Sequence, residues 1–249
     1  MPGHDIFIVN TGRIGYLKII MRLMVCPRTS VPSYLDAPVT HFVSMVDPDE
    51  KESIPQPRNA HSQLQLIFSD LDDIEMTLPK FSRYIPPQEH DISALVNFGR
   101  KLAPLDDWGL LAHCEAGISR STAASITILT AAGYPPQTAF EIVQKICPEM
   151  LPNRRILRLA DGLLETGGEL YRLAENHRTE AFKMAGYEDP TNVLLREFRE
   201  SAHSPRGFFN RFLDALPTGW RTLVGSGARQ RAAMNRRASV PRPSQRLRR

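Results

Sequence analysis

The chain has 249 residues, 42% of them hydrophobic and 23% charged, and carries a formal net charge of +4 at pH 7. This length and apolar content suit one domain of about 150 residues with appendages, and they exclude a chain too polar to bury a core. The charge is uneven, because residues 201–249 contain eleven arginines, no lysine and one acid, which leaves residues 1–200 with a net charge of −6. The basic character therefore belongs to the C-terminal end of the chain.

This C-terminal tail, residues 203–249, is dominated by Gly, Ser, Pro and Arg, and we expect it to be disordered. Two interpretations of its arginines remain open. They suit an anionic partner such as nucleic acid or a membrane surface, and they equally suit a solvated extension without a partner.

The three cysteines, Cys26, Cys114 and Cys147, lack the paired spacing of a zinc site or a disulfide framework, so the sequence implies no metal and no cofactor. This usage fits a reducing compartment, and we expect a cytoplasmic protein. The apolar stretch 14–26 is interrupted by a lysine and an arginine, which argues against a membrane span and against a signal peptide.

The first half of the chain is expected to supply three strands. Apolar, β-branched runs at residues 19–26, 41–46 and 64–68 are typical of buried strands. Residues 1–20 form an N-terminal extension of unknown use, in which residues 5–9 resemble a short strand.

The connection to the second half combines a loop and a helix. Residues 74–88 are expected to form a long ordered loop, which its length makes a candidate lid. Residues 89–103 carry apolar side chains at helical spacing, with Glu89 and Asp91 as favourable charges in the first turn.

The second half alternates a strand with helices. Residues 109–113 predict a strand, and helices are expected at 121–132, from Pro135–Pro136 onward, at 153–164 and within 169–202. This alternation predicts an α/β fold with a central, largely parallel sheet flanked by helices. In such a fold the ligand lies beyond the carboxyl ends of the strands.

One stretch, His-Cys-Glu-Ala-Gly-Ile-Ser-Arg-Ser at residues 113–121, joins the predicted strand to the helix that follows it. A loop that enters a helix N-terminus aims successive backbone N–H groups at one point, where the helix dipole also favours an anion. Gly117 allows the loop to curl around a ligand, and the planar fork of Arg120 can hold two phosphate oxygens. The expected phosphate-binding residues are Glu115, Ala116, Gly117, Ile118, Ser119 and Arg120.

The same field favours ionisation of the thiol, so we expect Cys114 to be a thiolate nucleophile at neutral pH. Ser121 can donate a hydrogen bond to the sulfur when it leaves again. His113 is expected to orient the loop backbone rather than to act as a base. Cys26 and Cys147 are expected to be core residues, with a resolving thiol for an oxidised Cys114 as the alternative.

The motif His-Cys-x5-Arg-Ser resembles the phosphate-binding loop of the cysteine-dependent protein tyrosine and dual-specificity phosphatases. A narrower resemblance, to bacterial proteins described as tyrosine-phosphatase-like, covers roughly residues 22–168. It is carried by residues 25–27, 40–44, 47–49, 66–70, 112–122 and 152–155. The expected organisation is an N-terminal extension (1–20), a phosphatase-like catalytic domain (21–168), a helical extension (169–202) and the tail (203–249).

The resemblance implies a protein tyrosine phosphatase-like fold and hydrolysis of phosphate monoesters, with protein phosphotyrosine as substrate, through a cysteinyl-phosphate. It also implies that an asparagine placed like Asn153 braces the phosphate loop, although Asn153 suits a simple helix N-cap equally well.

The resembled phosphatases also use an aspartate as general acid, and this chain departs from their common spacing. About thirty residues before the cysteine, residues 82–84 offer no acid. Asp70 directly follows a predicted strand and is the preferred candidate, with Asp72 and Asp73 as rivals.

Two other functional classes remain open. A non-catalytic reader of phosphorylated partners would need the same loop without turnover. A sulfurtransferase or an arsenate reductase would also use a cysteine in a loop, although the serine after Arg120 and the upstream acids favour phosphate ester chemistry.

Overall fold

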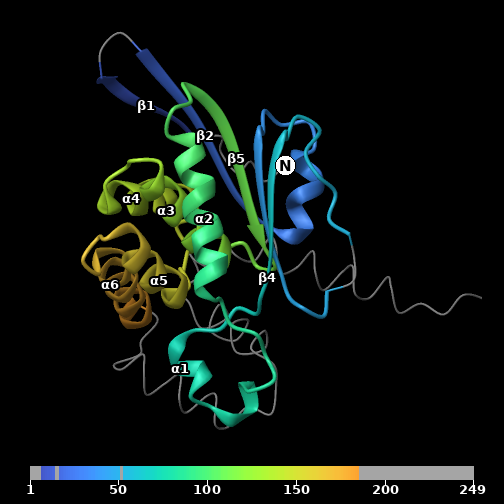
Figure 1. Ribbon diagram of the computed structural model, residues 1–249, viewed down its shortest axis with the longest axis vertical. Coiled ribbons are helices and arrows are strands. Elements are labelled where there is room, and N and C mark those ends of the chain that lie inside the picture. The colour runs from blue at the N-terminus through green and yellow to red at the C-terminus, as the bar shows by residue number, and fades with distance from the viewer. Residues whose placement is uncertain (1–6, 15–16, 51–52, 185–249) are drawn as a thin grey trace, which may run out of the picture.

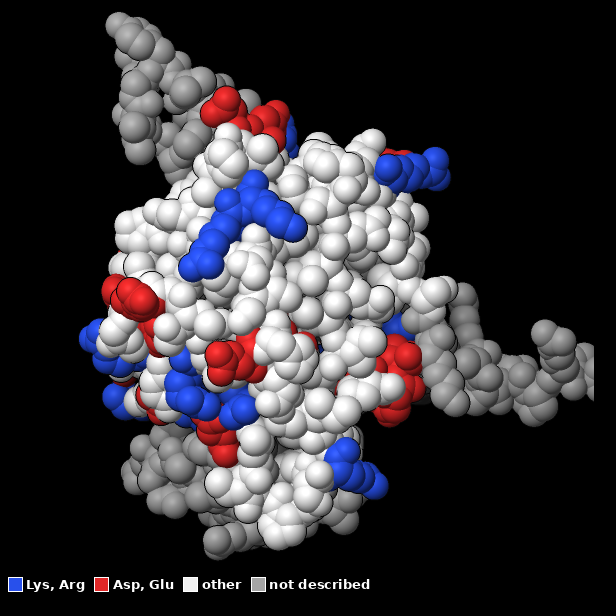
Figure 2. Space-filling model, viewed as in Figure 1, with Lys and Arg blue, Asp and Glu red and all other residues white. Residues whose placement is uncertain are grey.

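The computed structural model describes residues 7–14, 17–50 and 53–184 (Figure 1). The Arg-rich tail and the end of the predicted helical extension lie outside the described residues. The surface on the face shown in Figure 2 mixes acidic and basic side chains, without one large patch of a single sign.

A five-stranded sheet in the order β1-β2-β5-β3-β4 forms the centre of the described chain (Figure 1). Its strands are β1 (Phe7–Ile14), β2 (Leu17–Pro27), β3 (His41–Val46), β4 (Ser62–Ile67) and β5 (Asp107–Cys114). β2, β5, β3 and β4 run parallel, and β1 pairs antiparallel with β2. The predicted α/β fold with a largely parallel sheet is thereby confirmed, and Cys114 ends a central strand at the carboxyl edge.

The N-terminal extension has a structural use that the sequence left open. Residues 7–11 of β1 pair with residues 23–19 of β2, so the extension supplies an edge strand of the sheet. β2, the neighbour of the strand that carries the cysteine, is therefore not an edge strand over these residues.

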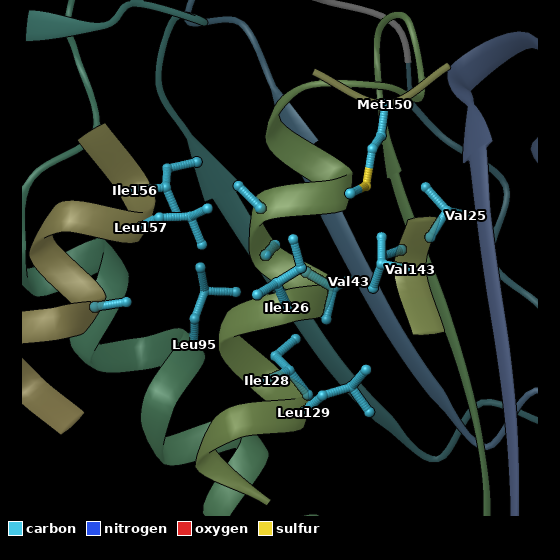
Figure 3. Packing of buried hydrophobic residues seen from close by; sticks show 14 of the residues in the cluster. Val25, Val43, Leu95, Ile126, Ile128, Leu129, Val143, Met150, Ile156 and Leu157 are labelled. Atoms are coloured by element: carbon cyan, nitrogen blue, oxygen red, sulfur yellow. The ribbon is translucent and has the colours of Figure 1, made fainter. Parts of the chain in front are cut away.

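Helices cover one face of the sheet, and a 3₁₀-helix with its flanking loop covers the other (Figure 1). The helices are α2 (Glu89–Leu102), α3 (Arg120–Ala131), α4 (Pro136–Ile146), α5 (Arg154–Leu164) and α6 (Glu169–Met184), and the 3₁₀-helix is η1 (Arg28–Tyr34). Side chains of β5 alternate between the two layers, with Leu110, Ala112 and Cys114 in the larger core and Leu111 in the smaller one. Figure 3 shows the larger core packed around Ile126 and Leu129 of α3.

α3 is buried along most of its length although it contains several hydroxyl side chains. Ser125 Oγ donates to the Ser121 carbonyl at 2.8 Å, and Thr127 Oγ1 donates to the Ala123 carbonyl at 2.9 Å. Because backbone carbonyls of the helix accept hydrogen bonds from these hydroxyls, the helix can be buried without leaving these donors unpaired.

The segment expected to be a long loop contains two short helices, α1 (Asp73–Met76) and the 3₁₀-helix η2 (Pro79–Phe81). It is tied down at both ends. Ser69 N donates to the Ile85 carbonyl at 2.7 Å, and Arg155 of α5 donates to the Pro87 carbonyl at 2.8 Å. The segment is therefore an anchored lobe at the carboxyl edge of the sheet, where it projects away from the helices (Figure 1).

Within the described ranges, no helix combines the length and the apolar character that crossing a membrane requires.

Two buried histidines make the stability of the fold sensitive to acid. Burial lowers the pKa of His41 to about 4, with a contribution from His61, and burial likewise lowers the pKa of His113 to about 4. Both rings are neutral in the folded protein, whereas the unfolded chain binds protons below about pH 6.5. The contribution of these two histidines to the free energy of unfolding is therefore fully present above pH 6.5 and is lost as the pH drops toward 4, by at most about 1.4 kcal/mol per pH unit for each histidine.

Urea unfolding at pH 7, 6, 5 and 4.5 measures this loss. We expect His41→Gln to flatten part of the dependence, because it removes one of the two titrating rings. An unfolding free energy that stays constant between pH 7 and pH 5 would contradict the assignment.

Candidate active site

The thiol of Cys114 lies at the centre of the loop that joins β5 to α3. Gly117 N donates to the sulfur at 3.3 Å, and Ser121 Oγ lies 3.3 Å from it. The structure thus brings together the thiol, the loop amide and the hydroxyl that the sequence assigned to one site. α3 begins at Arg120, so the helix N-terminus points into the same loop.

The loop can close only with glycine at position 117. Gly117 has a φ of 78°, in the left-handed region that other residues rarely adopt. A Cβ placed there would lie 2.4 Å from Pro27 N and 2.5 Å from the Cys26 carbonyl carbon, at the end of β2. The loop therefore rests directly on the backbone of the neighbouring strand.

The segment 147–153 backs the loop from behind. Leu151 N donates to the Ile118 carbonyl at 2.8 Å, and Asn153 N donates to the Ser119 carbonyl at 3.4 Å. Cys147 Sγ donates to the Gly117 carbonyl at 3.6 Å. These bonds hold the carbonyls on the outside of the loop, and Gly117 N reaches the sulfur on the inside.

Arg120 connects the loop to the ends of β3 and β4. Its buried side chain donates from Nη1 to the Phe68 carbonyl at 2.7 Å, and Nη1 and Nη2 donate to the two Asp47 oxygens at 3.2 and 3.3 Å. Burial opposes the charge, but the carboxylate of Asp70, the sulfur of Cys114 and Asp47 outweigh it and raise the pKa of Arg120. Nε is buried, lies 3.8 Å from Asp70 Oδ2 and has no hydrogen-bond partner among the described residues.

Asp70 lies in this site and shares its contacts with the loop. Ser119 Oγ donates to Asp70 Oδ1 at 2.7 Å, and Asn153 Nδ2 donates to the same oxygen at 2.9 Å. Oδ2 is the oxygen that faces Arg120. Asn153 also accepts from Ile156 N at 3.0 Å, so one side chain both caps α5 and braces the site.

The rival acids are held by arginines of α5. Arg154 Nε donates to Asp72 at 2.6 Å, and Arg155 and Arg158 each donate to Asp73 at 2.6 Å. Burial raises the pKa of Asp73, but the hydrogen bonds from Arg158 and Arg155 outweigh it and lower that pKa. Both oxygens of Asp73 are thus bound by arginines of α5, whereas Oδ2 of Asp70 faces Arg120, so Asp70 is the better placed proton donor.

The two acids that begin α2 have a local role. Asp91 Oδ2 accepts from Gln88 N at 2.8 Å, which closes the first turn of α2, and Glu89 is exposed at the same helix end. Neither acid has a recorded contact with the loop.

His113 supports the loop from the opposite face of the sheet. Its Nε2 lies 2.8 Å from Ser44 Oγ on β3, and its ring stacks on Phe42. Since burial keeps the imidazole neutral, it orients the end of β5 and does not supply a charge.

Cys26 and Cys147 are buried, and burial raises the pKa of both thiols. Cys26 belongs to the smaller core on the other face of the sheet from Cys114. Both cysteines therefore stand as protonated core residues.

The structure adds two residues that the sequence reasoning did not single out for the site, Asp47 and Arg28. Asp47 follows β3 directly, at the carboxyl edge where parallel strands collect functional side chains, so its position was a usable signal. Arg28 follows β2 and forms ion pairs with Glu50 and, at 3.9 Å, with Glu115 of the loop. No sequence pattern linked Arg28, Glu50 and Glu115.

Among the described residues, no group of three or more His, Cys, Asp or Glu side chains could hold a metal ion.

No protein-family model matches the chain, and no curated protein matches its sequence. Similar solved structures include Tk-PTP in its active form, with 13% identity, a TM-score of 0.41 and coverage of 58% of this chain and 91% of that chain. The human tyrosine phosphatase-like serine/threonine/tyrosine-interacting protein is 21% identical, with a TM-score of 0.40 and coverage of 57% and 89%. PTPMT1 in complex with PI(5)P is 18% identical, with a TM-score of 0.38 and coverage of 68% and 97%.

The close contact of Gly117 with β2 predicts that a methyl group added at this residue disturbs the loop. Gly117→Ala should push the loop off the Cys26–Pro27 backbone and strain a positive φ, so that the amide of residue 117 no longer points at the sulfur. We expect a decrease in Tm of a few degrees and a loss of about 100-fold or more in any reaction in which this amide stabilises a group bound at the sulfur. Gly162→Ala, at an α5 position where a Cβ meets nothing within 4 Å, is the matched control. Full activity in Gly117→Ala would contradict the role given to this contact.

Proposed function

We propose that this chain is a phosphatase that hydrolyses phosphate monoesters, with protein phosphotyrosine as substrate, through a cysteinyl-phosphate. The observation that supports it best is the arrangement around one sulfur. A loop amide and a hydroxyl lie 3.3 Å from Cys114 Sγ, and the buried donor Arg120 Nε has no hydrogen-bond partner among the described residues. A phosphate group bound in the loop would supply the acceptor that this donor lacks.

In the first step, the thiolate of Cys114 attacks phosphorus while the bond from phosphorus to the leaving oxygen breaks. The loop amides and Arg120 stabilise the equatorial oxygens, which become more negative in the transition state. Asp70 transfers a proton from Oδ2 to the leaving oxygen, so that the alcohol or phenol departs neutral. The product on the enzyme is a phosphate ester of the sulfur.

In the second step, water attacks the phosphorus and the sulfur–phosphorus bond breaks. The carboxylate of Asp70 accepts a proton from that water, and inorganic phosphate is released. Ser121 Oγ, 3.3 Å from the sulfur, donates to the departing thiolate. Asp70 thus serves both steps and returns to its protonated form.

Two alternative functions are separated from this one by simple assays. A reader of phosphorylated partners would bind phosphopeptides without turning over p-nitrophenyl phosphate. A sulfurtransferase would transfer sulfur from thiosulfate to cyanide, and an arsenate reductase would consume arsenate. The hydroxyl beside the sulfur and the carboxylate beside Arg120 favour phosphate ester chemistry.

Variants of the nucleophile and of the arginine test the proposed mechanism. Cys114→Ser should abolish turnover but retain binding of phosphate ligands, because the loop amides and Arg120 stay in place. Arg120→Lys should lose both, since a lysine cannot bind Asp47 and phosphate with one planar fork. Turnover of p-nitrophenyl phosphate and calorimetric titration with phosphate measure these effects. Activity above about a percent of wild type in Cys114→Ser would disprove the cysteinyl-phosphate, because the alkoxide is a far weaker leaving group than the thiolate.

Variants of Asp70 test the general acid. Asp70→Asn should lower turnover of phenyl phosphate by roughly 10²–10⁴-fold and that of p-nitrophenyl phosphate far less, because p-nitrophenolate leaves without a proton. It should also flatten the basic limb of the pH profile. Asp36→Asn, which removes an exposed carboxylate paired with Arg58, serves as the matched control. Equal losses on both esters in Asp70→Asn, or none, would transfer the role to Asp72 or Asp73.

A further inference from the structure

Carboxylates gather on one side of the phosphate loop, around Arg28. Residues 47–50 form a tight turn at the end of β3, in which Glu50 N donates to the Asp47 carbonyl at 3.0 Å. The turn presents Asp49 to solvent and brings Glu50 to Arg28, while Glu115 approaches the same arginine from the loop. We name Asp49, Glu50 and Glu115 the acidic rim.

The two arginines near the loop do not offset this charge. Arg120 is bound by Asp47 and lies beside Asp70, and Arg28 is bound by Glu50 and lies 3.9 Å from Glu115. With Asp70 protonated as the proposed proton donor, these contacts set three carboxylates, Asp47, Glu50 and Glu115, against two guanidinium groups. Asp49, which is exposed in the same turn, adds one further carboxylate.

The rim is accessible to a substrate. The Glu115 side chain is 28% exposed and the Glu50 side chain 18% exposed, whereas Arg28, between them, is 15% exposed. A group that approaches the bound phosphate from this side therefore meets carboxylate oxygens, and it meets a guanidinium that already has two acidic neighbours.

We propose that the acidic rim makes the enzyme select phosphorylated residues that are flanked by arginine or lysine and reject substrates with further negative charge. This preference rests on the proposed function, because it describes the surroundings of the same phosphate. A bound phosphate dianion adds to the negative potential of the rim, so a second anion on the substrate is repelled and a neighbouring cation is attracted. Polyphosphorylated ligands and acidic phosphopeptides are disfavoured for the same reason.

The test compares three phosphotyrosine peptides of equal length, with arginine, glutamine or glutamate on both sides of the phosphotyrosine. For the full chain at low salt, we expect kcat/KM to rank arginine above glutamine above glutamate, with about a tenfold difference between the extremes. The ratio should shrink toward one as sodium chloride is raised to about 0.5 M, where the Debye length is only a few ångströms.

Charge-removing variants assign the preference to the rim. Glu115→Gln, Glu50→Gln and Asp49→Asn should each lower the arginine-to-glutamate ratio about two- to threefold. Asp49→Asn changes an exposed side chain, so it gives a readout even where the other two disturb the loop. Glu180→Gln on α6, which removes a carboxylate paired only locally with Lys183, is the matched control and should leave the ratio unchanged.

The outcomes separate this proposal from the function on which it rests. A ratio of one or below in the wild type, or a ratio that all three rim variants leave unchanged, would overturn the preference. Failure to hydrolyse p-nitrophenyl phosphate, an ester without flanking charges, would overturn the phosphatase function itself. Turnover of that ester without any preference among the peptides would overturn the preference alone.

Discussion

The candidate site depends on the way the carbonyls of the loop are held. Backbone donors of Leu151 and Asn153 bind the carbonyls of residues 118 and 119 at 2.8 and 3.4 Å. A peptide group that turns its carbonyl outward turns its N–H inward, so these bonds decide where the loop amides point. The segment 147–153 is itself fixed from outside, because His177 of α6 lies 2.8 Å from the Met150 carbonyl. The orientation of the loop amides thus depends on the segment 147–153 and, through His177, on α6.

The parallel direction of the strands explains why one arginine can contact residues from several of them. Arg120 begins α3, and its guanidinium contacts Asp47 after β3 and the Phe68 carbonyl after β4. Because β3, β4 and β5 run in the same direction, their carboxyl ends lie at one edge, within reach of a single side chain. The same contacts desolvate and orient the guanidinium before any ligand arrives, which reduces the reorganisation that catalysis requires.

The sequence predicted the parts of the site that depend on local order, and it missed those that depend on long-range contacts. The spacing of Cys114, Gly117 and Arg120 follows from one strand–loop–helix unit, so the loop and the alternation of strands and helices were predictable. Asp47 and Arg28 lie far from the cysteine in sequence and meet the loop only because the strand order is β2-β5-β3. No periodicity encodes that order. Of the three acids that follow β4, Asp72 and Asp73 are hydrogen-bonded by arginines of α5, whereas Asp70 faces the loop. The sequence alone does not show which of the three lies at the site.

The anchored lobe shows how such distant contacts bear on the candidate chemistry. Asp70 lies where the chain leaves β4 for this lobe, and the next two acids fasten the lobe to α5 through Arg154 and Arg155. Arg154 also forms an ion pair with Glu175 of α6. The position of Asp70 therefore depends on the same helix whose His177 supports the loop. A carboxylate on a free loop would lose rotational entropy each time it met its partners. Ser119 and Asn153 hold the Asp70 side chain in place. Its rotational entropy is therefore lost once, when the chain folds, and not each time a ligand binds.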